Sequence, residues 1–278
     1  MKRITMAAWV LSAGLVCAGG SKPGYRTPIL TAPEALPSLV EKGFETKSLR
    51  GNDRNLPEPL ARADARTFPY SMVGAVSFFS GRQRYSGSAT LIKPTVALTA
   101  AHNLYDGREG FSTDVNFALG QYQGSAKRRA RAEATYLYTT TYVNEADRNS
   151  DSLRAFATDT GWLTFSRRLS QKAAPYTSRI VALKNGNPTY ALGYGLDRHN
   201  GRLPLSVAPT EGYFRMKGAY FENRSYGTEG GMSGGPVFGF FRGRLVQLGV
   251  VVSGFSDFTR SGIRVIDRGL VRKLRRVE

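Results

Sequence analysis

Short apolar runs separated by turn-forming residues dominate the chain from residue 68 to residue 252. The runs cover residues 72–79, 85–92, 96–99, 132–138, 161–165, 189–192, 212–216, 236–241 and 245–252, with Gly, Asn and Asp between them. Runs of this length suit β-strands, and their recurrence favours a sandwich or barrel over alternating β and α units. The sequence therefore predicts an all-β fold, and 278 residues suffice for one large domain or two small ones.

One helix is expected at the C-terminal end, over about residues 267–277. Its apolar residues repeat at spacings of four, four and three: Ile266, Leu270, Leu274 and Val277. Basic residues fall between them, and Asp267 suits the N-cap position. A basic amphipathic helix can also lie on a membrane surface, but this one is short, so we expect its apolar stripe to pack on the β-structure.

The first 20 residues have the pattern of an export signal. Two basic residues precede an uncharged apolar run over residues 4–16, and Ala18, Gly19 and Gly20 offer small residues for cleavage. A retained membrane anchor is the alternative, but such an anchor needs about 20 apolar residues. We therefore expect residues 1–20 to be removed and the mature protein to be secreted or periplasmic in a bacterium.

Cys17 is the only cysteine. A lipoprotein would use it as the lipid acceptor, but Val16 is larger than the residue that usually precedes such a cysteine. Cleavage after Ala18 or Gly20 leaves a mature chain without a thiol, although exported proteins usually enter an oxidising compartment. The fold is then expected to rest on burial alone.

Residues 21–66 are rich in proline, charged and small residues, which break any strand or helix periodicity. We interpret residues 21–50 as a candidate pro-segment, because they are too polar and proline-rich to add to a barrel. Cleavage after Arg50 would release a domain over residues 51–278.

The formal net charge is +18, and removal of residues 1–20, which hold Lys2 and Arg3 and no acid, leaves +16. Such a surface attracts anionic envelope polymers, lipid head groups and nucleic acid without specificity. Specific nucleic-acid recognition is disfavoured, because the cations are spread along the chain. No zinc, helix-turn-helix or RNA-binding signature accompanies them.

Two histidines limit the choice of a general base. His102 ends the segment Thr99-Ala100-Ala101-His102 just after an apolar run, where small residues allow a strand end to turn tightly. His199 lies in a polar turn, and we interpret it as a structural residue. His102 is therefore the candidate base.

The candidate nucleophile is Ser233, in Gly230-Gly231-Met232-Ser233-Gly234-Gly235. Glycines on both sides free the backbone for unusual dihedral angles and for close approach of a ligand. Such a turn can direct the N–H groups of Gly231 and Ser233 at one point, which is the arrangement of an oxyanion hole. An incidental serine in a glycine-rich turn is the alternative for this segment taken alone.

Taken together, the two segments resemble a known family. Thr99-Ala100-Ala101-His102 and Gly231-Met232-Ser233-Gly234-Gly235-Pro236 are similar to the histidine and serine motifs of chymotrypsin-like serine peptidases, in that family's order. Three further segments resemble the bacterial, disulfide-free, glutamyl-endopeptidase-like branch of this family: Gly51-Asn52-Asp53-Arg54, Phe68-Pro69-Tyr70 and Leu192-Gly193-Tyr194-Gly195. The likeness covers about residues 51–275.

The resemblance implies a chymotrypsin-like double six-stranded β-barrel, with barrels over about residues 67–165 and 175–260 and the site between them. It also implies a third catalytic residue, an acid that opens an apolar strand. Asp159, 57 residues after His102, matches that pattern. Asp147 and Asp151 are rivals, but they lie in a polar run without a following strand.

The resemblance also implies a substrate pocket. Its residues are Gly227, Thr228, Val252, Ser253 and Gly254. Thr228 matches the glutamyl branch, whereas Val252 stands where that branch has a histidine and Gly227 lacks the aspartate of basic-specific enzymes. We therefore expect a preference for an uncharged side chain before the scissile bond. Met232 replaces the usual Asn or Asp before the serine, but a hole built from N–H groups does not depend on that side chain.

These residues predict a secreted serine endopeptidase that acts on proteins or peptides through His102, Asp159 and Ser233, with an acyl-enzyme intermediate and no metal or organic cofactor. The alternative is a catalytically inactive homologue that binds surfaces or peptides through its charge. A quality-control protease with a peptide-binding module is disfavoured, because only 45 residues follow Ser233. We expect a monomer.

Overall fold

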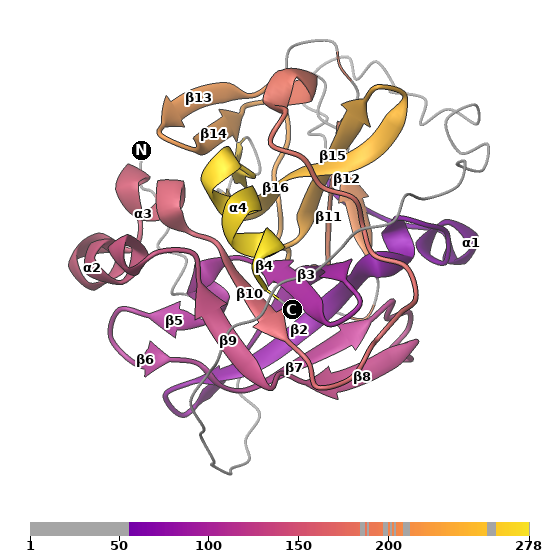
Figure 1. The fold of residues 1–278 in the computed structure, drawn as a ribbon, viewed down its shortest axis with the longest axis horizontal. Coiled ribbons are helices and arrows are strands. Elements are labelled where there is room, and N and C mark those ends of the chain that lie inside the picture. The colour runs from indigo at the N-terminus through magenta and orange to yellow at the C-terminus, as the bar shows by residue number, and fades with distance from the viewer. Residues whose placement is uncertain are drawn as a thin grey trace.

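Two curled antiparallel sheets make up most of the structure (Figure 1). The computed structural model describes residues 56–277 apart from 184–186, 188, 197–199, 201, 203, 208–211 and 255–259. The predicted export signal, Cys17, the candidate pro-segment and His199 lie outside the described residues. In the part of the chain that is described, no helix has the length and apolar character needed to cross a membrane.

The first sheet has seven strands in the order β8-β7-β2-β3-β4-β10-β9. They are β2 (Val73–Ser80), β3 (Gln83–Lys93), β4 (Val96–Thr99), β7 (Thr113–Leu119), β8 (Arg128–Arg131), β9 (Ala134–Leu137) and β10 (Gly161–Thr164). β2 and β3 form a hairpin that begins at the pair Ser80 and Gln83, with Gly81 in the turn at a φ of 56°. A positive φ suits glycine in a two-residue hairpin turn, so neighbouring apolar runs pair directly.

The second sheet has eight strands in the order β1-β12-β11-β15-β16-β17-β14-β13. They are β1 (Glu58–Pro59), β11 (Thr189–Gly193), β12 (Leu205–Val207), β13 (Phe214–Lys217), β14 (Tyr220–Asn223), β15 (Pro236–Phe241), β16 (Arg244–Gly254) and β17 (Ser261–Val265). β17 pairs with both β16 and β14 and is the last strand of this sheet in sequence. β1 precedes the first sheet in sequence but pairs with β12 of the second.

Short elements link the strands. The described ones are α1 (Arg62–Ala65), α2 (Thr140–Asn149), α3 (Leu153–Thr158) and α4 (Arg268–Arg275), the 3-10 turns η2 (Tyr70–Met72), η3 (Ala101–Asn103) and η4 (Ile180–Leu183), and the strands β5 (Tyr105–Asp106) and β6 (Gly110–Phe111). The all-β prediction is confirmed. The two sheets carry seven and eight strands, short edge strands included.

The C-terminal helix α4 packs where the two sheets meet (Figure 1). The Asp267 side chain accepts a hydrogen bond from the Leu270 N–H at 2.7 Å and caps the helix. Leu270 and Leu274 are fully buried, in a cluster that includes Trp162 of the first sheet and Val250 of the second. The predicted helix is confirmed, and it starts one residue after the predicted boundary because Asp267 is its cap.

Lys93, at the end of β3, is buried against the last turn of α4. Its Nζ donates to the carbonyl oxygens of Leu274 and, at 2.8 Å, of Val277. Burial disfavours the charged ammonium and lowers the pKa of Lys93 from 10.5 to about 8. The terminal carbonyls of a helix carry partial negative charge, which offsets part of this cost. Lys93 thus ties the helix to the first sheet.

Candidate active site

His102 and Asp159 lie beyond the ends of two paired strands of the first sheet. β4 and β10 are antiparallel neighbours with Thr99 opposite Gly161. His102 lies in the turn η3, which follows β4, and Asp159 ends α3 just before β10. Because the strands pair at these ends, the two side chains meet although 57 residues separate them. The adjacent strand ends therefore account for the pairing.

Two contacts join His102 to Asp159. The His102 backbone N–H donates to Oδ1 of Asp159 at 3.0 Å, and Nδ1 of the ring lies 2.6 Å from Oδ2. Asp159 is 1% exposed, so the carboxylate is held away from water. This geometry orients the imidazole with Nδ1 toward the carboxylate and leaves Nε2 for other chemistry.

The surroundings of His102 raise its pKa above the usual 6.5. Burial disfavours the imidazolium and acts in the opposite direction. The charge of Asp159 and its hydrogen bond favour the imidazolium and outweigh that effect, with smaller contributions from Asp151 and Asp106. The ring is therefore a stronger base than a free histidine.

The rival acids occupy other places. Asp147 accepts a hydrogen bond from the Tyr105 hydroxyl at 2.8 Å, near the end of α2. The Asp151 N–H bonds to the Asn149 side chain at 3.0 Å in the exposed link to α3. Of the three acids, Asp159 is the one that contacts His102.

Two glycines shape the loop that carries Ser233. Gly231 and Gly234 have φ values of 89° and 83°, in the left-handed region. A Cβ on Gly234 would lie 2.2 Å from Thr99 Oγ1 and 2.3 Å from the Ser88 carbonyl oxygen. A side chain at position 234 would therefore collide with the strand that leads to His102. The glycines serve both the turn and the close approach of the two sheets.

Three hydrogen bonds from β3 and from the turn η3 hold this loop. The Ser88 N–H donates to the Ser233 carbonyl oxygen at 2.7 Å, and the Ser88 hydroxyl donates to that of Gly231 at 2.8 Å. Asn103, next to His102, donates from Nδ2 to the Ser233 carbonyl oxygen at 3.0 Å. These bonds place the candidate nucleophile against the segment of the candidate base. The sequence interpretation missed Ser88 and Asn103, and the adjacency of Asn103 to His102 was the available signal.

The N–H groups of Gly231 and Ser233 make no hydrogen bond to any described residue. The neighbouring N–H groups differ, since Met232 donates to the Glu229 carbonyl and Gly234 to that of Val251. The N–H of the serine and the N–H two residues before it are thus available as donors, which suits an oxyanion hole. The Met232 side chain is fully buried, so it contributes apolar packing behind the loop.

Within the described residues, no hydrogen bond joins the Ser233 hydroxyl to the His102 ring. In ligand-free sites such bonds are often long, and they tighten when substrate binds. No set of three or more His, Cys, Asp or Glu side chains in the described ranges is placed to hold a metal ion.

The predicted pocket residues are only partly together. The Thr228 hydroxyl lies 3.4 Å from the Ser253 carbonyl oxygen and 3.2 Å from the Ser261 hydroxyl. A Cβ on Gly254 would lie 2.8 Å from Thr228 Oγ1, so glycine permits that approach. Gly227 is buried directly before Thr228. Thr228, Ser253 and Gly254 therefore form one small polar group, which Ser261 joins.

Val252 departs from the prediction. Its side chain is fully buried in the apolar cluster that also contains Trp162, Ile266 and Leu270. Val252 therefore belongs with Val250 to the apolar core that packs against α4, and not to the polar group of Thr228 and Ser253. The pairing of β16 with β17 is irregular between Val251 and Ser253.

The sequence interpretation also missed a buried acid behind the pocket strand. Glu222 of β14 is 3% exposed, and it accepts a hydrogen bond from the Tyr220 hydroxyl at 3.0 Å. The Tyr220 hydroxyl also lies 2.9 Å from that of Ser253. No sequence signal distinguished Glu222, because a single polar residue in a strand does not reveal its face.

Known families and structures share this organisation. The profile of the Trypsin family matches residues 61–264. No curated protein sequence matches the chain.

Several solved proteases have similar structures at low sequence identity. A Glu endopeptidase in complex with MPD has a TM-score of 0.64 and 19% identity, over 81% of this chain and 96% of that one. The thermostable serine protease AL20 from an extremophilic microorganism has a TM-score of 0.61 and 18% identity, over 74% and 95%. Protease Anisep from Arthrobacter nicotinovorans has a TM-score of 0.59 and 18% identity, over 73% and 93%.

Proposed function

Because this chain belongs to the Trypsin family and is thus a serine endopeptidase, we propose that Ser233, His102 and Asp159 hydrolyse peptide bonds through an acyl-enzyme intermediate. The observation that carries the proposal is the double contact between His102 and Asp159. Asn103, the residue after His102, donates a hydrogen bond to the backbone carbonyl of Ser233 and so keeps the serine close to this pair. A nucleophile, a base and a group that orients the base are the parts that such catalysis requires.

The chemistry proceeds in two halves. Ser233 Oγ attacks the scissile carbonyl carbon while Nε2 of His102 takes the hydroxyl proton. The C–N bond then breaks, and His102 gives that proton to the leaving amine. Water attacks the resulting ester in the same way, with His102 again as base, and releases the carboxylic acid and Ser233. Asp159 keeps the proton on Nδ1 and stabilises the imidazolium in both halves.

The developing oxyanion needs donors that are already in place. We assign this role to the N–H groups of Gly231 and Ser233, which have no partner among the described residues. Donors that are fixed before reaction cost no reorganisation in the transition state. The bonds from Ser88 to Gly231 and Ser233 hold the loop in position.

For the residue before the scissile bond, we propose an uncharged side chain. Thr228, Ser253 and Ser261 contribute hydroxyl groups to the polar group at the pocket, and Gly227 and Gly254 add no side chain. None of these residues supplies a charge that would bind an acidic or basic side chain. The basis for the preference is this group alone, since Val252 belongs to the apolar core.

Digestion of denatured casein tests the proposed function and the specificity together. We expect internal cleavage, with an uncharged residue before most cleavage sites as read by mass spectrometry. A fluorophosphonate reagent should stop the reaction and add its label to Ser233, because it reacts with an activated serine.

Absence of both cleavage and labelling would establish an inactive homologue. A dominant preference for Glu would instead show that Thr228 suffices for acidic recognition. A preference for Lys or Arg would point to Glu222 behind Ser253. Either result would overturn the uncharged preference without touching the triad.

We also propose that residues 1–20 direct export to the periplasm or medium and that residues 21–50 are removed on activation. The support is the basic start, the apolar run over residues 4–16 and the polar, proline-rich stretch that follows. Amino-terminal sequencing of active protein from the culture is expected to read Gly51 first. If fully active protein begins at Ser21, residues 21–50 are not removed on activation. If it begins at Met1, residues 1–20 are not a cleaved export signal.

A further inference from the structure

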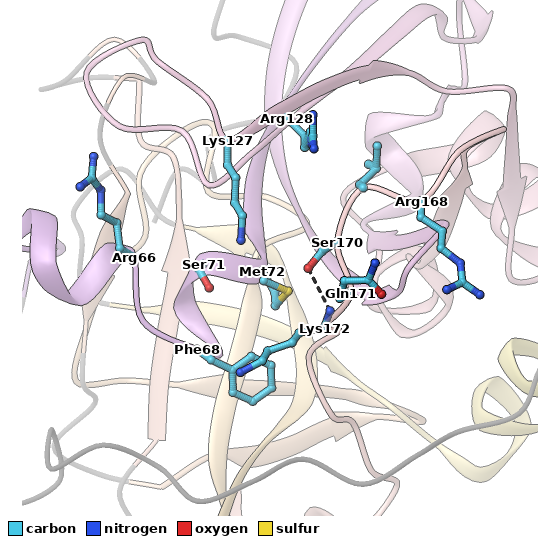
Figure 2. A pocket seen from close by; sticks show the side chains of 11 residues that line it. Arg66, Phe68, Ser71, Met72, Lys127, Arg128, Arg168, Ser170, Gln171 and Lys172 are labelled. Carbon is cyan, nitrogen blue, oxygen red and sulfur yellow. Dashed lines mark hydrogen bonds between the residues drawn. The ribbon is translucent and has the colours of Figure 1, made fainter.

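A basic cavity is lined by residues that follow α1, by residues of η2 and β8, and by the connection after β10 (Figure 2). Its volume is about 470 Å³. Five cations line it: Arg66, Lys127, Arg128, Arg168 and Lys172. The lining contains no acidic residue. None of the proposed catalytic or pocket residues contributes to it.

The cations come from three separate parts of the chain. Arg66 follows α1, Lys127 and Arg128 stand at the start of β8, and Arg168 and Lys172 lie on the connection after β10. Figure 2 shows Lys127 extending toward Met72 and Lys172 extending along the Phe68 ring, with Arg66 and Arg168 on the flanks. The fold, rather than a run of basic sequence, brings these charges together.

The five cations lack acidic partners. None of them forms an ion pair with a described residue, and Lys172 Nζ lies over the Phe68 ring, 5.9 Å from its centroid. All five side chains are exposed, whereas the floor residues Met72 and Leu169 are buried. Uncompensated like charges around one hollow raise its positive potential, so an anion that enters would relieve their repulsion.

The size and charge of the cavity indicate what it takes. Its volume falls within the range of small-molecule sites, so it admits a compact ligand but not a nucleic-acid duplex or a folded domain. Guanidinium groups match phosphate oxygens in bidentate pairs, and lysines add point charges. A peptide carboxylate also pairs with arginine, but linked phosphates place more charge in the same volume.

We propose that this cavity binds a short chain of linked phosphates, either free or at the end of a phosphodiester polymer. The bound chain would join the segment after β10 to β8 and α1, and would therefore stabilise the fold by mass action. The proposal does not depend on the proposed proteolysis, because binding is its readout.

Calorimetric titration of the full mature protein with tripolyphosphate, at about physiological salt, tests the proposal. The triple variant Lys127→Gln, Arg168→Gln and Lys172→Gln removes three charges from the cavity. A matched control, Arg268→Gln, Arg272→Gln and Arg276→Gln, removes three exposed charges from α4 and its end. We expect the cavity variant to lose about tenfold or more in affinity and the control less than about twofold.

Tripolyphosphate should also raise the Tm of the wild type and of the control, but not that of the cavity variant. Orthophosphate should bind more weakly, because it reaches fewer cations. Competition by a poly(glycerol phosphate) oligomer would identify a polymer end as the source, and its failure to compete would restrict the site to free oligophosphate.

Equal loss of affinity in the two triple variants would overturn the proposal, because it would assign binding to net charge. So would absence of binding to the wild type at this salt. If the cavity variant misfolds by circular dichroism, the single variant Lys127→Glu takes its place, with Lys217→Glu on exposed β13 as its control. Lys127→Glu must then lose about tenfold or more in affinity for tripolyphosphate, and Lys217→Glu less than about twofold.

Discussion

Replacing Ser233 by alanine is expected to lower kcat by about 10⁶-fold while the protein remains folded. The triad works as a unit, so loss of the nucleophile removes the covalent route and leaves only the contributions of binding and of the oxyanion donors. Ser233 holds its loop through its backbone carbonyl rather than its hydroxyl. The substitution should therefore leave the Tm nearly unchanged. Casein turnover and thermal unfolding of the purified variant measure the two effects.

Ser225→Ala is the matched control for this result. Ser225 lies before the same loop, and its hydroxyl bonds to the Asn223 side chain rather than to His102. The control should keep most of the activity. Turnover by Ser233→Ala at more than a trace level, in protein made by a protease-deficient host, would remove Ser233 from the mechanism.

Asp159→Asn is expected to lower kcat/KM by about 10⁴-fold. An amide can donate to Nδ1, which would favour the tautomer with the proton on Nε2 and prevent that atom from acting as base. It also removes the charge that stabilises the imidazolium. Asp151→Asn, the exposed rival, should change the rate little, and an equal loss from both would move the assignment of the acid.

The pH profile of kcat/KM separates this role from a structural one. Since Asp159 raises the pKa of His102 above 6.5, the wild-type rate should fall on the acid side as pH drops through that raised pKa. The variant lacks the carboxylate charge, so its acid limb should move to lower pH. For stability the sign is opposite: the His102–Asp159 contribution is fully present below about pH 6.5 and is lost as pH rises through the raised pKa. An unmoved acid limb would contradict the direct contact.

Local patterns predicted the strands and α4 well. The apolar runs became paired strands, and the spacing of Leu270 and Leu274 defined the buried face of α4. The same reasoning missed α2, because its residues are mostly polar. Its helical state depends on a cap from the Thr139 side chain and on burial of Tyr142 and Ala146, and those tertiary contacts have no local signature.

The site was predictable where motifs carry it and not elsewhere. His102 and Ser233 lie in turns rich in alanine or glycine, and the small residues there can be explained by the tight turns that the chemistry requires. Ser88 and Asn103 instead bond to a loop more than 100 residues away in sequence, which no local pattern indicates. Val252 was misplaced because β16 is buried along both of its faces, so that its apolar run does not show which valines belong to the core and which face a pocket. In the structure Val250 and Val252 share one apolar cluster, and Val251 lies in the other.

The hydrogen bonds from Ser88 and Asn103 cross from the first sheet to the loop of the second sheet that carries Ser233. Neither half of the molecule therefore holds a complete site. The apolar clusters also contain residues of both sheets, such as Trp162 and Val250, so separation of the halves would release Ser233 and Gly231 and expose these clusters together. Activity is thus a reporter of how tightly the halves dock, because neither half completes the site by itself.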